Sequence, residues 1–180
     1  MCGKRRRTIA AALSLALFLA ACTEDRSTKV TSTDVTQSTQ SMQSTQSTSP
    51  LARGRSLYEV GCAACHRKDG AGSVGVGSPL RGSTWVVGPE VRLILIALHG
   101  VRGPIEVNGV RYQLEMPPFG TVYNDDEIAA ILTYVRSAWG NRAAPVLQGR
   151  VAAVRRATAA RGDSWTAAEL LARDGEGAAE

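Results

Sequence analysis

Residues 62–66 read Cys-Ala-Ala-Cys-His, and this short stretch decides how the rest of the chain is interpreted. Two thiols three residues apart, near the end of one helix, can reach the vinyl groups on two adjacent rings of a porphyrin. The histidine that follows then lies under the iron. The Cys-x-x-Cys-His pattern therefore predicts covalent attachment of one haem c through Cys62 and Cys65, with His66 as an axial ligand of the iron.

Three other interpretations of the two cysteines compete with haem attachment. A structural zinc site needs a second pair of ligands, and His99 is the only histidine outside the motif. A thioredoxin-like dithiol does not require His66 and expects a strand–helix context. A disulfide between Cys62 and Cys65 would be strained and would leave His66 unexplained.

The second axial ligand is expected downstream of the motif. Met1 is the initiator and Met42 lies in a polar segment, so Met116 is the methionine that belongs to a folded region. Two prolines follow it and fix the backbone, and a stiff loop can hold a weak thioether ligand. We therefore expect Met116 to bind the iron. The alternatives are His99, which precedes Gly100 at an expected helix end, and an open sixth position.

The start of the chain has the pattern of a bacterial lipoprotein signal. Residues 4–7 are basic, and the apolar run that follows is too short to span a bilayer. Residues 19–22, Leu-Ala-Ala-Cys, match the lipobox and predict a signal peptide over residues 1–21, with Cys22 as the lipidated residue. An ordinary secretory signal is the alternative.

Residues 22–50 are nearly all Ser, Thr and Gln after the first few positions, so they are expected to form a disordered tether. Thr23 stands where an aspartate would favour retention in the inner membrane. The expected location is therefore the periplasm, with a lipid anchor in the outer membrane.

The net charge gives no indication of a nucleic-acid partner. The chain has 21 basic and 16 acidic residues, a formal charge of +5. Four of the basic residues lie in the leader, so 17 basic residues face 16 acidic ones after its removal. The mature protein is nearly neutral.

Helices are expected over residues 51–64, 89–98 and 124–139, from their apolar spacing and their end signals. Leu57 and Val60 are expected to face inward from the first of these helices. The last helix should begin with a capping box, in which Asn124 and Glu127 bond to each other's backbone.

With the attachment motif and the segment Met116-Pro117, the first and last of these helices make residues 51–140 similar to a class I c-type cytochrome. Residues 98–105 and 130–141 more closely resemble the cytochrome domains that accompany periplasmic quinoprotein sugar and alcohol dehydrogenases. The resemblance implies an all-α cytochrome c fold over residues 51–142, with three to five helices around one haem. Residues 143–180 would add a helical, partly disordered extension.

The resemblance also implies roles for residues around the ring. The carbonyl of Pro79 would accept a hydrogen bond from the free ring nitrogen of His66. Trp85 would donate to a haem propionate, or be plain core, and Arg81 is a second candidate propionate partner. Gly54 would let the first and last helices cross closely.

The function implied is one-electron transfer rather than catalysis: the protein is expected not to be an enzyme. Electrons would pass from a periplasmic dehydrogenase to another cytochrome or a terminal oxidase. Two alternatives stay open: a peroxidase-like haem enzyme or ligand sensor with an open sixth site, and an obligate cytochrome subunit of a dehydrogenase complex.

Overall fold

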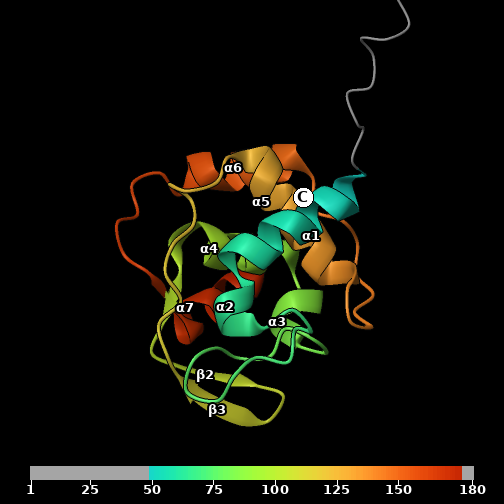
Figure 1. Cartoon of the computed structure of the whole chain (residues 1–180). Coiled ribbons are helices and arrows are strands. Elements are labelled where there is room, and N and C mark those ends of the chain that lie inside the picture. Colours follow the sequence, from blue (N-terminus) through green and yellow to red (C-terminus); the bar gives the residue numbers. More distant parts are fainter. Residues whose placement is uncertain (1–48, 176–180) are drawn as a thin grey trace, which may run out of the picture. The chain divides into compact units, whose positions relative to one another are not determined.

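The computed structural model describes residues 49–175, and these are the residues coloured in Figure 1. The predicted signal peptide, Cys22 and all of the tether up to residue 48 lie outside the described residues, as does the chain after residue 175. Among the described helices, none combines the length and the apolar character needed to cross a membrane.

The haem motif lies on two successive helices. Helix α1, Pro50–Gly61, begins with Ser49, whose Oγ accepts a hydrogen bond from the backbone nitrogen of Ala52 (3.2 Å). Helix α2, Ala63–His66, follows after one residue, so the single helix predicted over 51–64 is in fact broken at Cys62. The prediction that Val60 faces inward is wrong, because its side chain is 83% exposed. It lies two positions beyond the fully buried Tyr58, on the opposite side of the helix.

Helix α1 packs closely against α5, Asp125–Ser137. A Cβ atom at Gly54 would overlap the backbone carbonyl of Ala130, so only glycine permits this approach. Tyr58 packs beside the crossing against Tyr134, with ring centroids 5.5 Å apart. The predicted close crossing of the first and last helices of the cytochrome region is confirmed.

The predicted capping box at the start of α5 is also confirmed. Asn124 Oδ1 accepts a bond from the backbone nitrogen of Glu127, and Glu127 Oε2 accepts one from the backbone nitrogen of Asn124, both at 3.0 Å. The helix is thereby fixed at the point where the preceding loop enters it.

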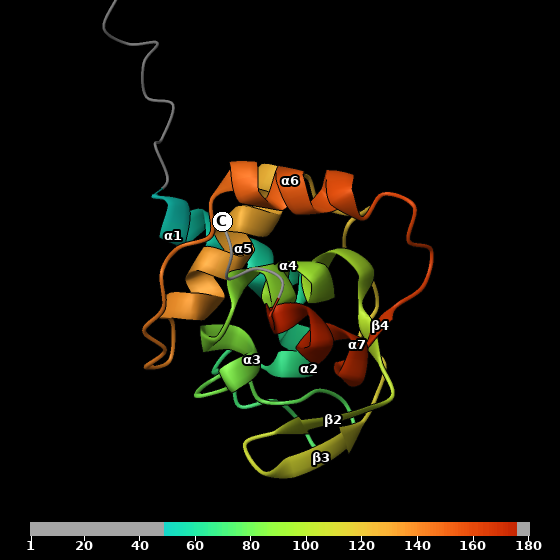
Figure 2. The same ribbon diagram turned by 180° about the vertical axis from the view of Figure 1, so that it is seen from behind.

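Helix α4, Glu90–His99, is the central element, and its residues 92–98 are all buried. The short helix α3, Thr84–Val87, precedes it. Figures 1 and 2 show α4 surrounded by the other helices from both sides. Gly100 ends α4 with a positive φ of 78°, a conformation that glycine adopts without strain.

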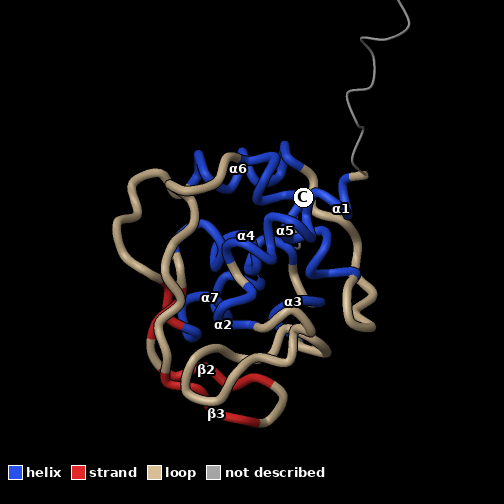
Figure 3. The backbone as a smooth tube through the Cα atoms, viewed as in Figure 1, coloured by secondary structure: helices blue, strands red, loops and turns tan. Residues whose placement is uncertain are grey.

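A β-hairpin follows α4 and corrects the prediction of an all-α fold. Strand β2, Pro104–Val107, pairs in antiparallel fashion with β3, Val110–Gln113. Asn108 and Gly109 form the turn with φ values of 53° and 78°, as in the tight turns that match strand twist. Figure 3 shows the hairpin at one end of an otherwise mainly helical domain.

The C-terminal extension is part of the same core. Helix α6, Gln148–Ala157, packs on α4 and α5, and helix α7, Ala167–Ala172, packs on α4. Strand β4, Trp165–Thr166, pairs in parallel with β1, Val101–Arg102. The extension contributes five buried side chains to the core cluster: Val146, Val151, Val154, Trp165 and Leu170.

Candidate haem site

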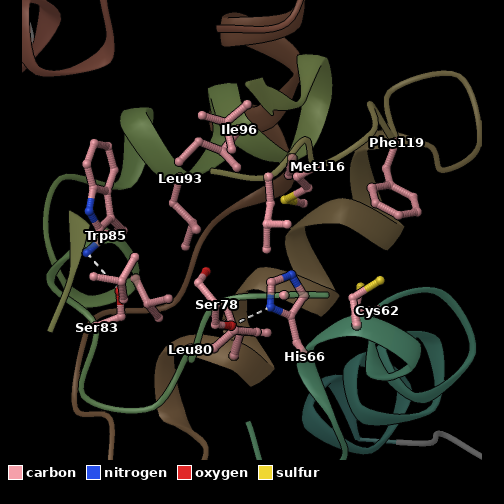
Figure 4. A pocket seen from close by; sticks show the side chains of 18 of the residues that line it. Cys62, His66, Ser78, Leu80, Ser83, Trp85, Leu93, Ile96, Met116 and Phe119 are labelled. Carbon is pink, nitrogen blue, oxygen red and sulfur yellow. Dashed lines mark hydrogen bonds between the residues drawn. The ribbon is translucent and has the colours of Figure 1, made fainter. Parts of the chain in front are cut away.

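A cavity of about 230 Å³ lies between the motif, α3, α4, α5 and the hairpin (Figure 4). Its walls are mainly apolar. They include Leu93, Ile96 and Ala97 from α4, Ile128, Ile131, Leu132 and Val135 from α5, and Ile105, Val107 and Tyr112 from the hairpin. The hairpin, which an all-α fold would not contain, thus forms one side of the site.

His66 lines this cavity with an imidazole whose tautomer is fixed. Its Nδ1 lies 2.8 Å from the carbonyl oxygen of Ser78 (Figure 4). Because a carbonyl only accepts, Nδ1 carries the hydrogen and Nε2 keeps its lone pair for a metal. Burial lowers the pKa of His66, and the bond to Ser78 opposes this. The imidazole is therefore neutral at neutral pH, which is the form that binds iron.

The acceptor for His66 is the carbonyl of Ser78, so the prediction that Pro79 supplies it is wrong by one residue. The reason lies at Gly77, where a Cβ atom would come within 2.7 Å of the carbonyl oxygen of Cys65. The chain passes directly against the motif at Gly77, which brings the next carbonyl to the imidazole. Pro79 lines the cavity instead.

Cys62 and Cys65 both line the cavity, and Figure 4 shows Cys62 beside His66. They are not bonded to each other; Cys62 is half-buried and Cys65 is exposed. Burial, with a smaller contribution from Cys65, raises the pKa of Cys62 to about 11. Within residues 49–175, no three His, Cys, Asp or Glu side chains form a group suited to a metal ion, so a zinc site finds no second ligand pair there.

Met116 lines the same cavity from the chain between the hairpin and α5. We call residues 115–123 the Met116 loop. Its backbone forms a two-bond bridge with Val101, since Val101 N donates to Met116 O (3.1 Å) and Met116 N donates to Val101 O (2.8 Å). A Cβ atom at Gly100 would overlap the carbonyl oxygen of Met116, so Gly100 allows this close pairing.

The end of α4 also holds the Met116 loop. The backbone nitrogens of Phe119 and Gly120 donate to the carbonyls of Ala97 (3.0 Å) and Leu98 (3.1 Å). These carbonyls lie in the last turn of α4, where no later helical N–H group is available to them. The N–H groups of the loop therefore supply the hydrogen bonds that the last carbonyls of α4 lack. Met116 lies on a segment that is fixed in this way.

Of the two roles expected for Trp85, the structure agrees with the core residue, and Arg81 lies at the surface. Trp85 lines the cavity, but its Nε1 donates to the carbonyl of Glu106 in the hairpin at 2.7 Å. The indole N–H is therefore already hydrogen-bonded within the protein. The Arg92 guanidinium lies 4.7 Å from the centroid of the Trp85 ring. Arg81 is exposed and is not among the cavity-lining residues. The structure supports neither residue as a propionate donor.

His99 lies away from the cavity. Its Nε2 is 2.8 Å from Thr158 Oγ1, and its ring lies nearly perpendicular to that of Trp165, with centroids 6.3 Å apart. Both partners belong to the C-terminal extension. The structure therefore gives no support to His99 as the sixth ligand.

The donor set fits a haem c. Two thiols and a neutral imidazole lie at one wall of an apolar cavity, and a thioether lines it from a separate segment. Thioether bonds from Cys62 and Cys65 would hold the ring, and His66 would bind its iron. Imidazole with thioether is an axial pair used by electron-transfer haem proteins.

Comparison with known proteins also indicates a protein that binds haem c. The family described as "Cytochrome C oxidase, cbb3-type, subunit III" matches residues 49–135. Cytochrome c-552 of Thermus thermophilus is 38% identical over 94 residues, which are 50% of this chain and 70% of that protein. The gluconate 2-dehydrogenase cytochrome c subunit of Pantoea cypripedii is 37% identical over 109 residues, 57% of this chain and 24% of the subunit. The cytochrome c subunit of alcohol dehydrogenase (quinone) from Gluconobacter oxydans is 32% identical over 92 residues, 50% of this chain and 19% of the subunit.

The chain belongs to the cytochrome c family. It binds haem c covalently at the Cys62–His66 motif, and it is a cytochrome c electron carrier or the cytochrome subunit of a dehydrogenase. The matched region spans a quarter or less of the length of the dehydrogenase subunits named above.

Proposed function

We propose that the protein is a one-electron carrier whose haem iron is bound by His66 and Met116. The observation that carries this proposal is that both side chains line one apolar cavity. Met116 is also the only methionine among residues 49–175. The bound haem supplies an Fe(III)/Fe(II) couple, and a soft thioether ligand favours Fe(II) and raises the potential.

The protein's own contribution is to hold the ligands still and to keep water away. The Ser78 carbonyl fixes the His66 ring, and the Val101 bridge fixes the backbone at Met116. The apolar side chains of α4 and α5 that line the cavity would exclude water from a bound haem. A site whose geometry does not change between oxidation states loses little energy to rearrangement when an electron enters or leaves.

The proposed route takes electrons from a periplasmic dehydrogenase to a downstream cytochrome or terminal oxidase. The relatives named as cytochrome subunits of gluconate and alcohol dehydrogenases support the donor class. The same relatives favour a second candidate, in which the chain is itself a subunit of a dehydrogenase complex. Purification under mild conditions distinguishes the two, because a subunit elutes with its enzyme and a mobile carrier elutes alone.

The proposed location is the periplasm, with a lipid on Cys22 holding the protein in the outer membrane. The lipobox at residues 19–22 and the polar segment that follows it are the support for this proposal. The Cys22→Ser variant should appear in the soluble periplasmic fraction with its haem intact. Retention of that variant in membranes would contradict the lipid anchor.

Ligand binding separates the carrier from a haem enzyme or sensor. A carrier with both axial positions filled should show a reversible one-electron redox titration and react slowly, or hardly at all, with CO and cyanide. Rapid, stoichiometric CO binding by the reduced protein would show an open sixth position and would contradict the proposal.

A further inference from the structure

Arg155 lies on α6, in the extension beyond the residues that the cytochrome family matches. Its guanidinium contacts three acceptors on another part of the chain. Nη1 donates to the carbonyl of Gly120, Nη2 donates to the carbonyl of Tyr123 at 3.0 Å, and Nε donates to Asp125 Oδ1 at 2.6 Å. One side chain thus joins the end of the Met116 loop to the start of α5.

The chemistry of the guanidinium suits this arrangement. Its donors form a rigid planar fork, and hydrogen bonds from a charged donor are stronger than neutral ones. The carboxylate of Asp125 balances the charge, while the two carbonyls take the remaining directions. A lysine at this position would offer a point charge on a flexible stem and could not reproduce the three fixed directions.

Gly120 is consequently held from two sides. Its backbone nitrogen donates to Leu98 of α4 at 3.1 Å, and its carbonyl accepts from Arg155 of α6. A Cβ atom at Gly120 would lie 2.7 Å from the Leu98 oxygen and 3.2 Å from Arg155 Nη1, which shows how closely the loop is enclosed. Buried Val151 and Val154 anchor α6 in the core, so the helix offers a fixed support.

We propose that Arg155 is a positioning residue that keeps the Met116 loop closed and so keeps Met116 on the iron. This inference rests on the proposed function, in which Met116 is the sixth ligand. Arg155 is not among the cavity-lining residues. It acts through the backbone of residues 120–123, and without it the loop should open more often.

The test is the affinity of the ferric holoprotein for imidazole, which competes with Met116 for the sixth position. The apparent affinity is proportional to the fraction of molecules with an open loop. Arg155→Gln should raise the imidazole association constant about tenfold or more, which corresponds to about 1.4 kcal/mol. It should also weaken the far-red band of the sulfur–iron bond, while far-ultraviolet circular dichroism stays unchanged.

Arg156→Gln is the matched control, since Arg156 is the exposed neighbour on the same helix and takes no part in these three bonds. It makes the same change in net charge and should leave imidazole affinity at the wild-type value. Arg155→Lys keeps the charge, provides a second variant if Arg155→Gln fails to fold, and should give an intermediate affinity.

Wild-type imidazole affinity in a folded Arg155→Gln or Arg155→Lys variant would overturn the proposal. An equal rise in Arg156→Gln would overturn it as well, because the effect would then come from net charge. Failure of the underlying function looks different: the wild type would lack the far-red band and bind imidazole as tightly as Met116→Ala does.

Discussion

The two sides of the haem cavity are built in different ways. The His66 side comes from the motif and from the loop at residues 70–77, which contains four glycines. Its key bond joins residues 66 and 78. The Met116 side is assembled from distant parts of the chain. Val101 bridges Met116, the end of α4 binds residues 119 and 120, and Arg155 of the extension holds residues 120 and 123.

This difference has a consequence for stability and function. A side formed within residues 62–78, and joined covalently to the haem, stays together whenever the ring is attached. A side formed by long-range contacts depends on the whole domain and opens first when any of them weakens. We therefore expect substitutions on the Met116 side to change how the iron is bound. Substitutions on the His66 side should instead change assembly of the whole domain.

The largest effect is expected from Cys65→Ala, which removes one of the two covalent links on the His66 side. Without the ring, the cavity of about 230 Å³ would be unfilled, which at about 24 cal/mol per Å³ amounts to roughly 5 kcal/mol. That is comparable with the whole stability of a small domain. The yield of protein with attached haem should be much lower for the variant than for the wild type. It is measured by the haem absorbance that stays with the protein after extraction with acidified acetone.

Cys22→Ser is the control for that experiment, because it removes a thiol outside the described domain. It should keep covalent haem at the wild-type level. A Cys65→Ala protein that accumulates with a full and unextractable haem would contradict the assignment of the motif.

Met116→Ala should remove the far-red sulfur–iron band and lower the reduction potential, because the soft ligand that favours Fe(II) is gone. The protein should remain folded with its haem attached, since the His66 side is unchanged. His99→Ala is the matched variant and should keep both the band and the potential. The reverse pattern would transfer the sixth-ligand role to His99.

Two glycine substitutions compare the two sides directly. Gly100→Ala places a methyl group against the carbonyl of Met116 in a backbone with φ of 78°, and should lower the free energy of unfolding by about 2–4 kcal/mol. Gly77→Ala places a methyl group 2.7 Å from the carbonyl oxygen of Cys65. It should lower the free energy of unfolding by about 1–3 kcal/mol. Denaturant unfolding of the holoproteins measures both.

The sharper difference is in ligation. Gly100→Ala should weaken the far-red band and raise imidazole affinity at denaturant concentrations where the domain is folded. Gly77→Ala should leave both at wild-type values. If the two variants changed imidazole affinity equally, the two sides would not be independent.

The smallest effect concerns His99, which joins α4 to the extension. Burial, and then the charges of Arg161 and Arg155, lower its pKa from the ordinary value of 6.5. The unfolded chain therefore takes up the proton first as pH falls, so this group's contribution to stability is complete above about pH 6.5 and is lost below it. Between about pH 7 and pH 5, the wild type should lose more unfolding free energy than His99→Gln. Parallel pH profiles for the two proteins would contradict this.

The sequence was most informative where the structure is local. The motif at residues 62–66 and the capping box at Asn124 were predicted because each depends on a few neighbouring residues. The close packing at Gly54, which joins distant parts of the chain, was expected only from the family resemblance. The hairpin was missed although its signal was present. Asn108-Gly109 between apolar residues is a strong indication of a tight hairpin turn.

Other features could not be predicted from the sequence. The choice of Ser78 over Pro79 depends on how closely the chain passes Cys65 at Gly77. Strands β1 and β4 have two residues each, too few for any periodicity, and they pair across some sixty residues. The three bonds of Arg155 exist only once α6 is placed beside α5, so an arginine in a basic helix gave no sign of them.

The most direct test of the account is nuclear magnetic resonance of the reduced holoprotein with carbon-13 in its methionine methyl groups. A methyl group held over the face of a haem is shifted far upfield by the ring current of the porphyrin. We predict one such signal, absent from Met116→Ala and unchanged in His99→Ala. A reduced wild-type protein whose methionine methyl signals all lie at the positions of an unfolded chain would contradict binding of the iron between His66 and Met116.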